Sequence, residues 1–175
     1  MASYGDTLVS EEERKALIAG FESGRIPLME FIRSVNRMVE ADGLPSDPAL
    51  GTAVVTCFGR HSEGRDLMAS LLLLHGFSVI PADRNADLDD IISLCSQPDV
   101  TVLCMSVQTT YDCPESMQIS DMLEEAGIRE GIVLNIGGAA ISKGIAERAG
   151  CDVYGMTASE SVRLIKEEVL RRNGS

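Results

Sequence analysis

The stretch Thr52-Ala-Val-Val-Thr-Cys-Phe58, followed by Gly59-Arg-His-Ser-Glu-Gly64, decides the fold of this chain. Its first part is a continuous apolar run with the length and composition of a buried strand. A short polar loop comes next, and the leucine-rich run 67–74 that follows is typical of a helix. The stretch predicts a strand, a loop and a helix in that order. The loop then lies at the carboxyl edge of a parallel sheet, where open α/β folds place their ligands.

The same alternation continues toward the C-terminus. We expect strands at 52–58, 77–81, 100–105, 131–136 and 152–154, and helices at about 64–75, 85–97, 113–126, 139–149 and 158–172. The runs 100–105 and 131–136 are continuously apolar, as strands covered on both faces are. Five such units with right-handed crossovers predict an α/β fold with a doubly wound, five-stranded parallel sheet in the flavodoxin-like order 2-1-3-4-5.

A short helical arm precedes the sheet. Residues 1–9 carry no periodic pattern and are expected to be loose, whereas Ser10 and Glu13 form a capping box that opens a helix to about Gly24. Pro27 suits the first turn of a second helix, which ends near Asp42. We therefore divide the chain into an arm at 1–48 and an α/β domain at 49–175. Two helices cannot close a core alone, so the arm must pack on the main domain or on another chain.

Composition excludes several classes of function. The chain has 175 residues, a formal net charge of −12, no Trp and only seven Phe and Tyr, which argues against binding nucleic acid. No apolar run is long enough for a membrane span, and the acidic N-terminus is not a signal peptide. The five cysteines are widely spaced without a Cys-x-x-Cys pair. We expect a cytoplasmic protein with reduced cysteines and no zinc site.

A nucleotide site is disfavoured. Residues 59–66 imitate a phosphate-binding loop, but Arg65 stands in the place of the lysine and Asp66 in the place of the serine or threonine. A carboxylate there repels phosphate groups. No Gly-x-Gly-x-x-Gly follows the first strand, so a dinucleotide is disfavoured as well.

Three anchors on separate loops resemble the cobalamin-binding domain family. His61-x-x-Gly64 is followed, after 41 intervening residues, by Ser106, and Gly137-Gly138 comes after Val107 and 29 further residues. The family's signature is Asp-x-His-x-x-Gly, a distant Ser-x-Leu and a distant Gly-Gly, and both gaps agree with it. The resemblance covers about 51–172 and is nearest to the corrinoid proteins of methyltransferase systems.

The resemblance implies cobalamin as the cofactor, with the corrin ring over the strand ends and the nucleotide tail beside the strands. His61 is then the cobalt ligand, Ser106 bonds the tail at the pocket bottom, and Gly137 and Gly138 leave room for the tail. The candidate cofactor-binding residues are His61, Ser62, Glu63, Gly64, Ser106, Gln108, Thr110, Gly137 and Gly138, with His61 the only candidate metal ligand.

Each anchor also has an ordinary explanation. Turn chemistry accounts for single glycines, and a serine after a strand often caps the next helix. The second histidine, His75, precedes Gly76 at an expected helix end and needs no functional account.

The chain departs from the family pattern at two positions. Gly59 stands where the family has the aspartate that accepts the histidine's second N–H, and Glu63 is the nearest candidate to replace it. Gln108 replaces the leucine of Ser-x-Leu and makes the pocket wall more polar. In addition, the arm supplies at most half of the four-helix cap of many family members, so the cap is reduced, or two chains form a homodimer through these helices, or a partner shields the cofactor.

The leading hypothesis is a corrinoid carrier, not a stand-alone enzyme, that moves a methyl group on cobalt between partner methyltransferases and depends on a reductive activator. The alternative is a cobalamin-dependent sensor without catalysis of its own, which the missing aspartate favours because a loosely held axial ligand is easier to exchange. A third possibility is an interaction protein with a degenerate pocket.

Overall fold

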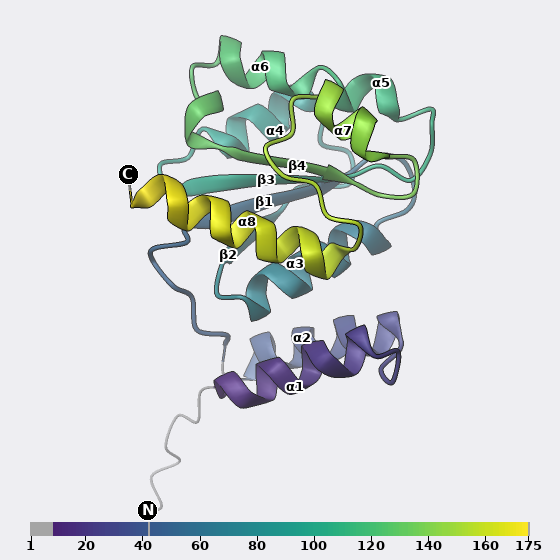
Figure 1. Cartoon of the computed structure of the whole chain (residues 1–175), viewed down its shortest axis with the longest axis vertical. Coiled ribbons are helices and arrows are strands. Elements are labelled where there is room, and N and C mark those ends of the chain that lie inside the picture. The colour runs from purple at the N-terminus through teal and green to yellow at the C-terminus, as the bar shows by residue number, and fades with distance from the viewer. Residues whose placement is uncertain (1–8, 42, 175) are drawn as a thin grey trace, which may run out of the picture.

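The computed structural model describes residues 9–41 and 43–174, which form an α/β fold around one parallel sheet (Figure 1). Residues 1–8, which we expected to be loose, lie outside the described part, as do Asp42 and Ser175. The sheet has the strand order β2-β1-β3-β4. Its strands are β1 (Thr52–Cys57), β2 (Ser78–Pro81), β3 (Val100–Ser106) and β4 (Val133–Gly137). The predicted parallel α/β class and the order of the first four strands are confirmed.

Helices cover both faces of the sheet. One face carries α3 (Glu63–Leu74) and α8 (Ala158–Asn173). The opposite face carries α4 (Leu88–Cys95), α5 (Cys113–Ser116), α6 (Ile119–Glu125) and α7 (Lys143–Arg148), and a short 3-10 turn, η1 (Arg129–Gly131), precedes β4.

We expected one helix at 113–126, and the structure has two. Gln118 lies at the break: its backbone N–H donates to the carbonyl of Glu115 three residues back, at 3.1 Å. The carbonyl of Pro114, which a continuous α-helix would offer to that N–H, accepts the side-chain amide of Gln118 at 3.3 Å instead. A side chain has replaced one backbone bond of the helix.

The buried strands divide their side chains between two cores. Ala53, Val55 and Cys104 belong to the cluster under α3 and α8, whereas Val54 and Leu103 belong to the cluster under α4 and α6. This alternation is the two-residue period of a strand. Burial raises the pKa of the Cys104 thiol, so this cysteine is an unreactive core residue, as expected for the buried cysteines.

The arm consists of α1 (Glu11–Glu22) and α2 (Leu28–Ala41), and it packs on the main domain. The Ser10–Glu13 capping box begins α1 as predicted. Phe31 of α2 is fully buried in the core shared with α3, and its ring stacks on Phe21 with 4.5 Å between centroids. The Arg14 guanidinium donates to the carbonyl of Leu74 at 3.3 Å. The arm therefore lies against α3, and a domain boundary at residue 48 stays a prediction.

The expected fifth strand at 152–154 is wrong: within the described residues this segment lies beside β4 but forms no strand. Its one backbone bond to β4 runs from the Asp152 N–H to the carbonyl of Leu134 at 2.9 Å. The return bond, at 2.7 Å, goes from the Leu134 N–H to the Asp152 carboxylate, and the Asn135 amide donates to the carbonyl of Val153 at 3.1 Å. Side chains thus occupy the positions that a backbone ladder needs.

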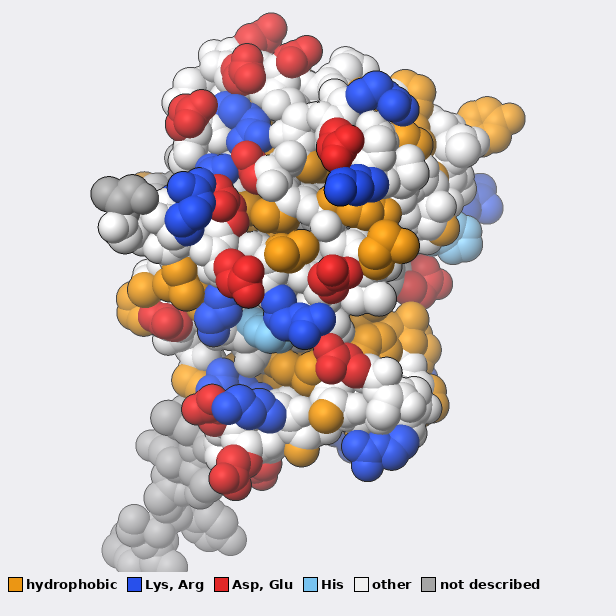
Figure 2. Space-filling model, in the orientation of Figure 1, with side chains coloured by type: hydrophobic (Ala, Val, Ile, Leu, Met, Phe, Trp, Pro, Cys, Tyr) orange, Lys and Arg blue, Asp and Glu red, His pale blue; other side chains and the backbone are white. Residues whose placement is uncertain are grey.

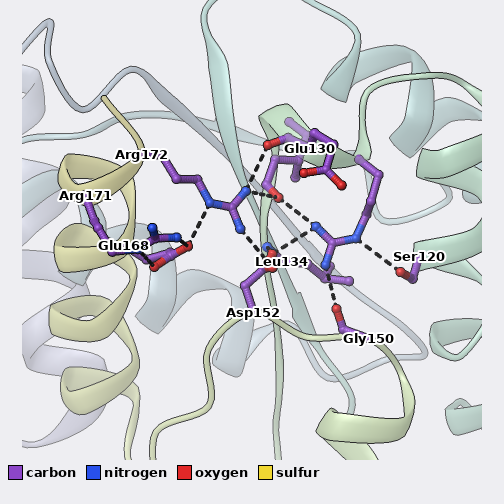
Figure 3. Close-up of polar contacts among 10 residues, drawn as sticks. Ser120, Glu130, Leu134, Gly150, Asp152, Glu168, Arg171 and Arg172 are labelled. Carbon is purple, nitrogen blue, oxygen red and sulfur yellow. Dashed lines mark hydrogen bonds and ion pairs between the residues drawn. The ribbon is translucent and has the colours of Figure 1, made fainter. Parts of the chain in front are cut away.

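The Asp152 carboxylate is fixed by two arginines (Figure 3). Arg129 donates to it at 3.0 Å and Arg172 at 2.8 Å. Arg172 also pairs with Glu168 at 2.8 Å, which in turn accepts from Arg171 at 2.7 and 2.8 Å. The network connects the C-terminal turns of α8 to the outer edge of β4, which explains why Asp152 turns its side chain inward instead of continuing a strand.

Figure 2 shows acidic and basic side chains interspersed over the face drawn, without a continuous basic stripe. Among the residues that the structure describes, no helix is both long and apolar enough to cross a membrane.

Glu168 gives the fold a testable dependence on pH. Hydrogen bonds from Arg171 and then Arg172 lower the pKa of its carboxyl group from 4.5 to about 2. A depressed pKa means that the ionised group stabilises the folded state above about pH 4.5 and loses this effect as the pH falls toward 2. We expect Glu168→Gln to lower the free energy of unfolding at pH 7 by about 1 kcal/mol, near the upper end for partly exposed ion pairs.

Urea unfolding of both proteins between pH 7 and pH 2.5 measures this difference, which should shrink below pH 4.5. Glu167→Gln, at the exposed neighbouring position, is the matched control and should stay within about 0.5 kcal/mol of the unchanged protein. A Glu168 difference that stays constant down to pH 2.5 contradicts the role of the ionised carboxylate.

Candidate functional site

A cavity of about 340 Å³ opens at the carboxyl ends of β3 and β4. Such a volume falls at the lower end of the range for small-molecule sites, about 300–1,000 Å³. It lies on the sheet face that carries α3 and α8, and the first turns of both helices border it. Its lining residues are Gly64, Leu67, Met68, Met105, Ser106, Gln108, Asn135, Gly137, Gly138, Ala139, Tyr154, Gly155, Met156, Thr157, Ala158 and Ser161.

Five of the nine predicted cofactor-binding residues line this cavity, and Ser106 lies at their centre. It is the last residue of β3, is 5% exposed, and accepts a hydrogen bond from the Gln108 side-chain amide at 3.0 Å. It does not cap a helix, because α5 begins only at Cys113. Gln108 gives the wall the polar group that its replacement of leucine predicts.

Gly64 is required by the close approach of α3 to Ser106. A Cβ at position 64 would overlap Ser106 Oγ and lie 2.8 Å from the Gln108 amide nitrogen. Any larger residue would push the first turn of α3 away from the strand end. The glycine therefore allows the Ser106 hydroxyl and the Gln108 amide to lie beside the first turn of α3. The free backbone N–H groups of that turn are available to a polar ligand.

Gly137 and Gly138 differ in what they do. Gly137 ends β4 and pairs with Ser106 across the sheet, and a Cβ there would meet nothing within 4 Å. Gly138 has a φ of +116°, and a Cβ there would overlap the Val107 carbonyl oxygen and lie 2.8 Å from the Val107 nitrogen. The space at Gly137 belongs to the cavity, whereas Gly138 is required by the packing of two backbones. We expected both glycines to leave room for a ligand, and both line the cavity, so that role stays a prediction for each.

The segment before α8 was missing from the sequence-based site. We took its start for a strand, but it turns inward, so that Tyr154, Gly155 and Thr157 line the cavity. The sequence did contain a signal, because Thr157 followed three residues later by Glu160 is a typical helix start. In the structure Thr157 accepts a hydrogen bond from the Glu160 N–H at 3.1 Å and begins α8. Helix N-termini at a sheet edge often face ligands. Asn135 was also missed, because apolar residues surround it in the sequence and the run was interpreted only as a buried strand. The residue is 3% exposed.

His61 lies on the loop after β1 and does not line the cavity. Its side chain is 64% exposed, and Nδ1 is 3.8 Å from a carboxylate oxygen of Glu63, which is 56% exposed. Thr110 is exposed on the loop after β3 and also lies outside the cavity. Within the described residues no group of three or more His, Cys, Asp and Glu side chains could hold a metal ion.

Ser62 fixes the base of the His61 loop. It is 8% exposed, accepts from Arg84 at 2.9 Å and donates to Asp66 at 3.2 Å. Asp66 is also held by Arg65 at 2.9 Å, and Arg65 donates to the carbonyl of Ala82 at 3.0 Å. These bonds connect the loop after β1 to the loop after β2, and they give Ser62 a structural role that the sequence did not predict.

The names of curated relatives agree with the resemblance to corrinoid proteins that the three loop anchors indicate. The chain is 31% identical over 122 residues to the trimethylamine corrinoid protein 2 of Methanosarcina acetivorans, which covers 69% of this chain and 56% of that protein. It is 27% identical over 180 residues to dimethylamine corrinoid protein 1 of the same organism, covering 93% and 84% of the two chains. The chain is thus similar in sequence to methylamine corrinoid proteins. These relatives confirm the resemblance that the three loop anchors indicate.

The chain spans a little more than half of the length of the trimethylamine corrinoid proteins that it matches. No protein-family model matches the chain.

Solved structures share the fold of this chain. The methanol:cobalamin methyltransferase complex of Methanosarcina barkeri superposes with a TM-score of 0.77 at 20% identity, covering 91% of this chain and 64% of that one. A cobalamin-binding protein from Desulfitobacterium hafniense superposes with a TM-score of 0.68 at 15% identity, covering 90% and 78%. At these identities the likeness concerns the fold.

The two glycines at the end of β4 predict different losses of stability. Gly138→Ala should lower the free energy of unfolding by about 3 kcal/mol, because it combines a positive φ with backbone overlap. Gly127→Ala, at a φ of +71° with open space around it, isolates the conformational cost and should lose about 1 kcal/mol. Gly137→Ala should lose roughly 0.5 kcal/mol or less, since its Cβ meets no atom. Urea unfolding compares the three variants, and a Gly138 variant no less stable than the Gly127 variant contradicts the contact with Val107.

Proposed function

We propose that this protein binds a corrinoid at the carboxyl edge of its sheet and carries a methyl group on cobalt between partner methyltransferases. The observation that carries the proposal is the cavity that Ser106 and Gly137 line at the carboxyl ends of β3 and β4, on the residue spacing of the cobalamin-binding family. The homology to methylamine corrinoid proteins supports the same function.

The cavity suits the nucleotide tail of a corrinoid. Gly137 offers open space beside the strand ends, and a cavity lined by both apolar and polar groups continues from it. Ser106 and Gln108 contribute hydroxyl and amide groups to the cavity wall. An elongated ligand with apolar rings and hydrogen-bonding substituents matches that combination.

His61 is the residue that we assign to cobalt. It stands on an exposed loop at the edge of the sheet, and its imidazole makes no short hydrogen bond that coordination would have to break. When bound, the corrinoid supplies a cobalt centre for methyl transfer. The chain's own residues hold the tail, orient His61 and leave the opposite face of the ring accessible to a partner.

In this structure helices α1 and α2 are not placed to shield the corrin ring, so another protein segment has to do so. No residue of α1 or α2 lines the cavity, since both helices pack toward α3. A partner methyltransferase, a reductive activator or the helices of a second copy would then cover the cofactor during each step. We include the homodimer and the activator in the proposal as further partners.

A cobalamin-dependent sensor is the second candidate. The high exposure of His61 and the glycine at position 59 favour it, because a weakly held axial ligand exchanges readily. Single-turnover transfer of a methyl group from the loaded protein to a purified partner methyltransferase supports the carrier. A conformational change on ligand exchange without any transfer supports the sensor.

Binding of cobalamin tests the site. The purified protein mixed with hydroxocobalamin and desalted should retain one cofactor per chain, measured by its absorption spectrum. Gly137→Val should remain folded and lose about 100-fold or more in affinity, because the new side chain fills the cavity where the tail lies. Gly131→Val, where a Cβ also meets nothing within 4 Å, is the control for a bulky residue outside the cavity. Normal retention by the Gly137 variant contradicts this path for the tail.

Coordination by His61 has its own test. His61→Ala should still bind cobalamin through the tail cavity but remove nitrogen coordination from cobalt. Electron paramagnetic resonance of the Co(II) form should show nitrogen hyperfine splitting in the unchanged protein and none in the variant. His75→Ala, at the end of α3, is the matched control and should leave the splitting intact. Identical spectra of the unchanged protein and His61→Ala contradict the assignment.

A further inference from the structure

Gly59 leaves a space that another residue's carboxylate fills. Its φ is +74°, and a Cβ at this position would lie 3.2 Å from Oδ2 and 3.7 Å from Oδ1 of Asp112. Asp112 comes from the loop after β3, more than fifty residues away in the chain. The neighbouring loops at the ends of β1 and β3 thus bring a carboxylate to the one position where the family's signature has lost its own.

Asp112 is fixed in this orientation. The Thr109 hydroxyl donates to its Oδ2 at 2.6 Å, and its backbone N–H donates to the carbonyl of Thr109 at 3.2 Å. Although Asp112 directly precedes α5, its carboxylate does not cap that helix. The usual structural task of an aspartate at this position is therefore not performed, and the side chain faces the loop after β1 instead.

We propose that Asp112 is the positioning residue for His61, supplying from the loop after β3 the carboxylate that the family carries two residues before its histidine. The proposal rests on the proposed coordination of cobalt by His61. The oxygens of an aspartate at position 59 would lie roughly 2.4 Å from its Cβ. Asp112 Oδ2 lies 3.2 Å from the same Cβ position, so the two distances differ by less than about one bond length.

In this arrangement Asp112 accepts the N–H of the imidazole nitrogen that does not ligate cobalt. That bond fixes the tautomer and the ring orientation and makes the ligating nitrogen more basic. It also explains why residue 59 is glycine, since a side chain there would press against the Asp112 carboxylate.

Glu63 is the competing carboxylate: among the ion pairs of the described residues, His61 pairs with Glu63 and not with Asp112, but the pair is loosely held. Its oxygen is 3.8 Å from His61 Nδ1, and both side chains are more than half exposed. An exposed pair of flexible side chains at that distance orients weakly. Asp112 is half-buried and tied to Thr109, so its carboxylate is already in a fixed place before the histidine arrives.

The test uses the full chain loaded with cobalamin and reduced to Co(II). Asp112→Asn keeps the size of the side chain but removes the charge, and it should lower the equilibrium constant for His61 coordination about tenfold or more. The readout is the fraction of Co(II) with nitrogen hyperfine splitting, together with a rise in the Co(II)/Co(I) midpoint potential. Glu115→Gln, an exposed carboxylate three residues further on, is the matched control, and Glu63→Gln tests the competitor.

Two further variants keep the proposal falsifiable. Thr109→Val removes the bond that holds Asp112 and should reduce coordination without removing the charge. The double variant Asp112→Ala with Gly59→Asp returns the carboxylate to the family's position and should restore the splitting, with thermal melting as the check that each variant is folded.

The possible failures are distinguishable. An Asp112→Asn protein with unchanged splitting and potential overturns the role of Asp112 while leaving cofactor binding by His61 intact. A folded double variant that stays without splitting assigns Asp112 to loop structure alone and also overturns it. If the unchanged protein binds cobalamin without nitrogen splitting, coordination by His61 fails and this inference fails with it, while the corrinoid-binding function stands. If the protein binds no cobalamin, the proposed function itself fails.

Discussion

The end of β3 determines where everything in the candidate site lies. Ser106 pairs with Cys57 on one side and with Gly137 on the other, so three parallel strands finish on the same rung. Their loops therefore start from one level. A change of register by one residue would turn Ser106 to the opposite face and away from Gly64. The site depends on hydrogen bonds of the sheet before it depends on any side chain.

Glycines then set how closely the elements approach this rung, and they do so for unlike reasons. Gly64 lets a helix come against a hydroxyl, and Gly138 lets two loops touch backbone to backbone. Gly137 alone leaves a volume that no protein atom uses. In the sequence motif these three residues are all simply glycine. Only the atoms around each position distinguish a glycine that the fold needs from one that leaves space for a ligand.

Much of the fold could be predicted because the local signals were strong. The apolar runs of β1 and β3 and the capping box at Ser10 depend on residues close together in the chain. The fifth strand failed because its outcome depended on Asp152 meeting arginines from η1 and α8. For the site, the resemblance to the cobalamin-binding family indicated Ser106 and Gly137. It could not place Asn135 or Asp112, whose neighbours come from distant parts of the sequence.

The side-chain closure of β4 has a consequence for how this protein behaves in a crowded solution. A sheet with free edges offers rows of unpaired N–H and C=O groups to any passing strand. Here the N–H of Leu134 is occupied by a carboxylate that belongs to a network of arginines, which no incoming backbone can easily displace. The opposite edge, β2, is only four residues long and ends in Pro81, which has no N–H to donate. Both borders of the sheet are thus poor templates for strand addition. The chain can expose its strand ends to a ligand without also offering its strand edges to another copy of itself.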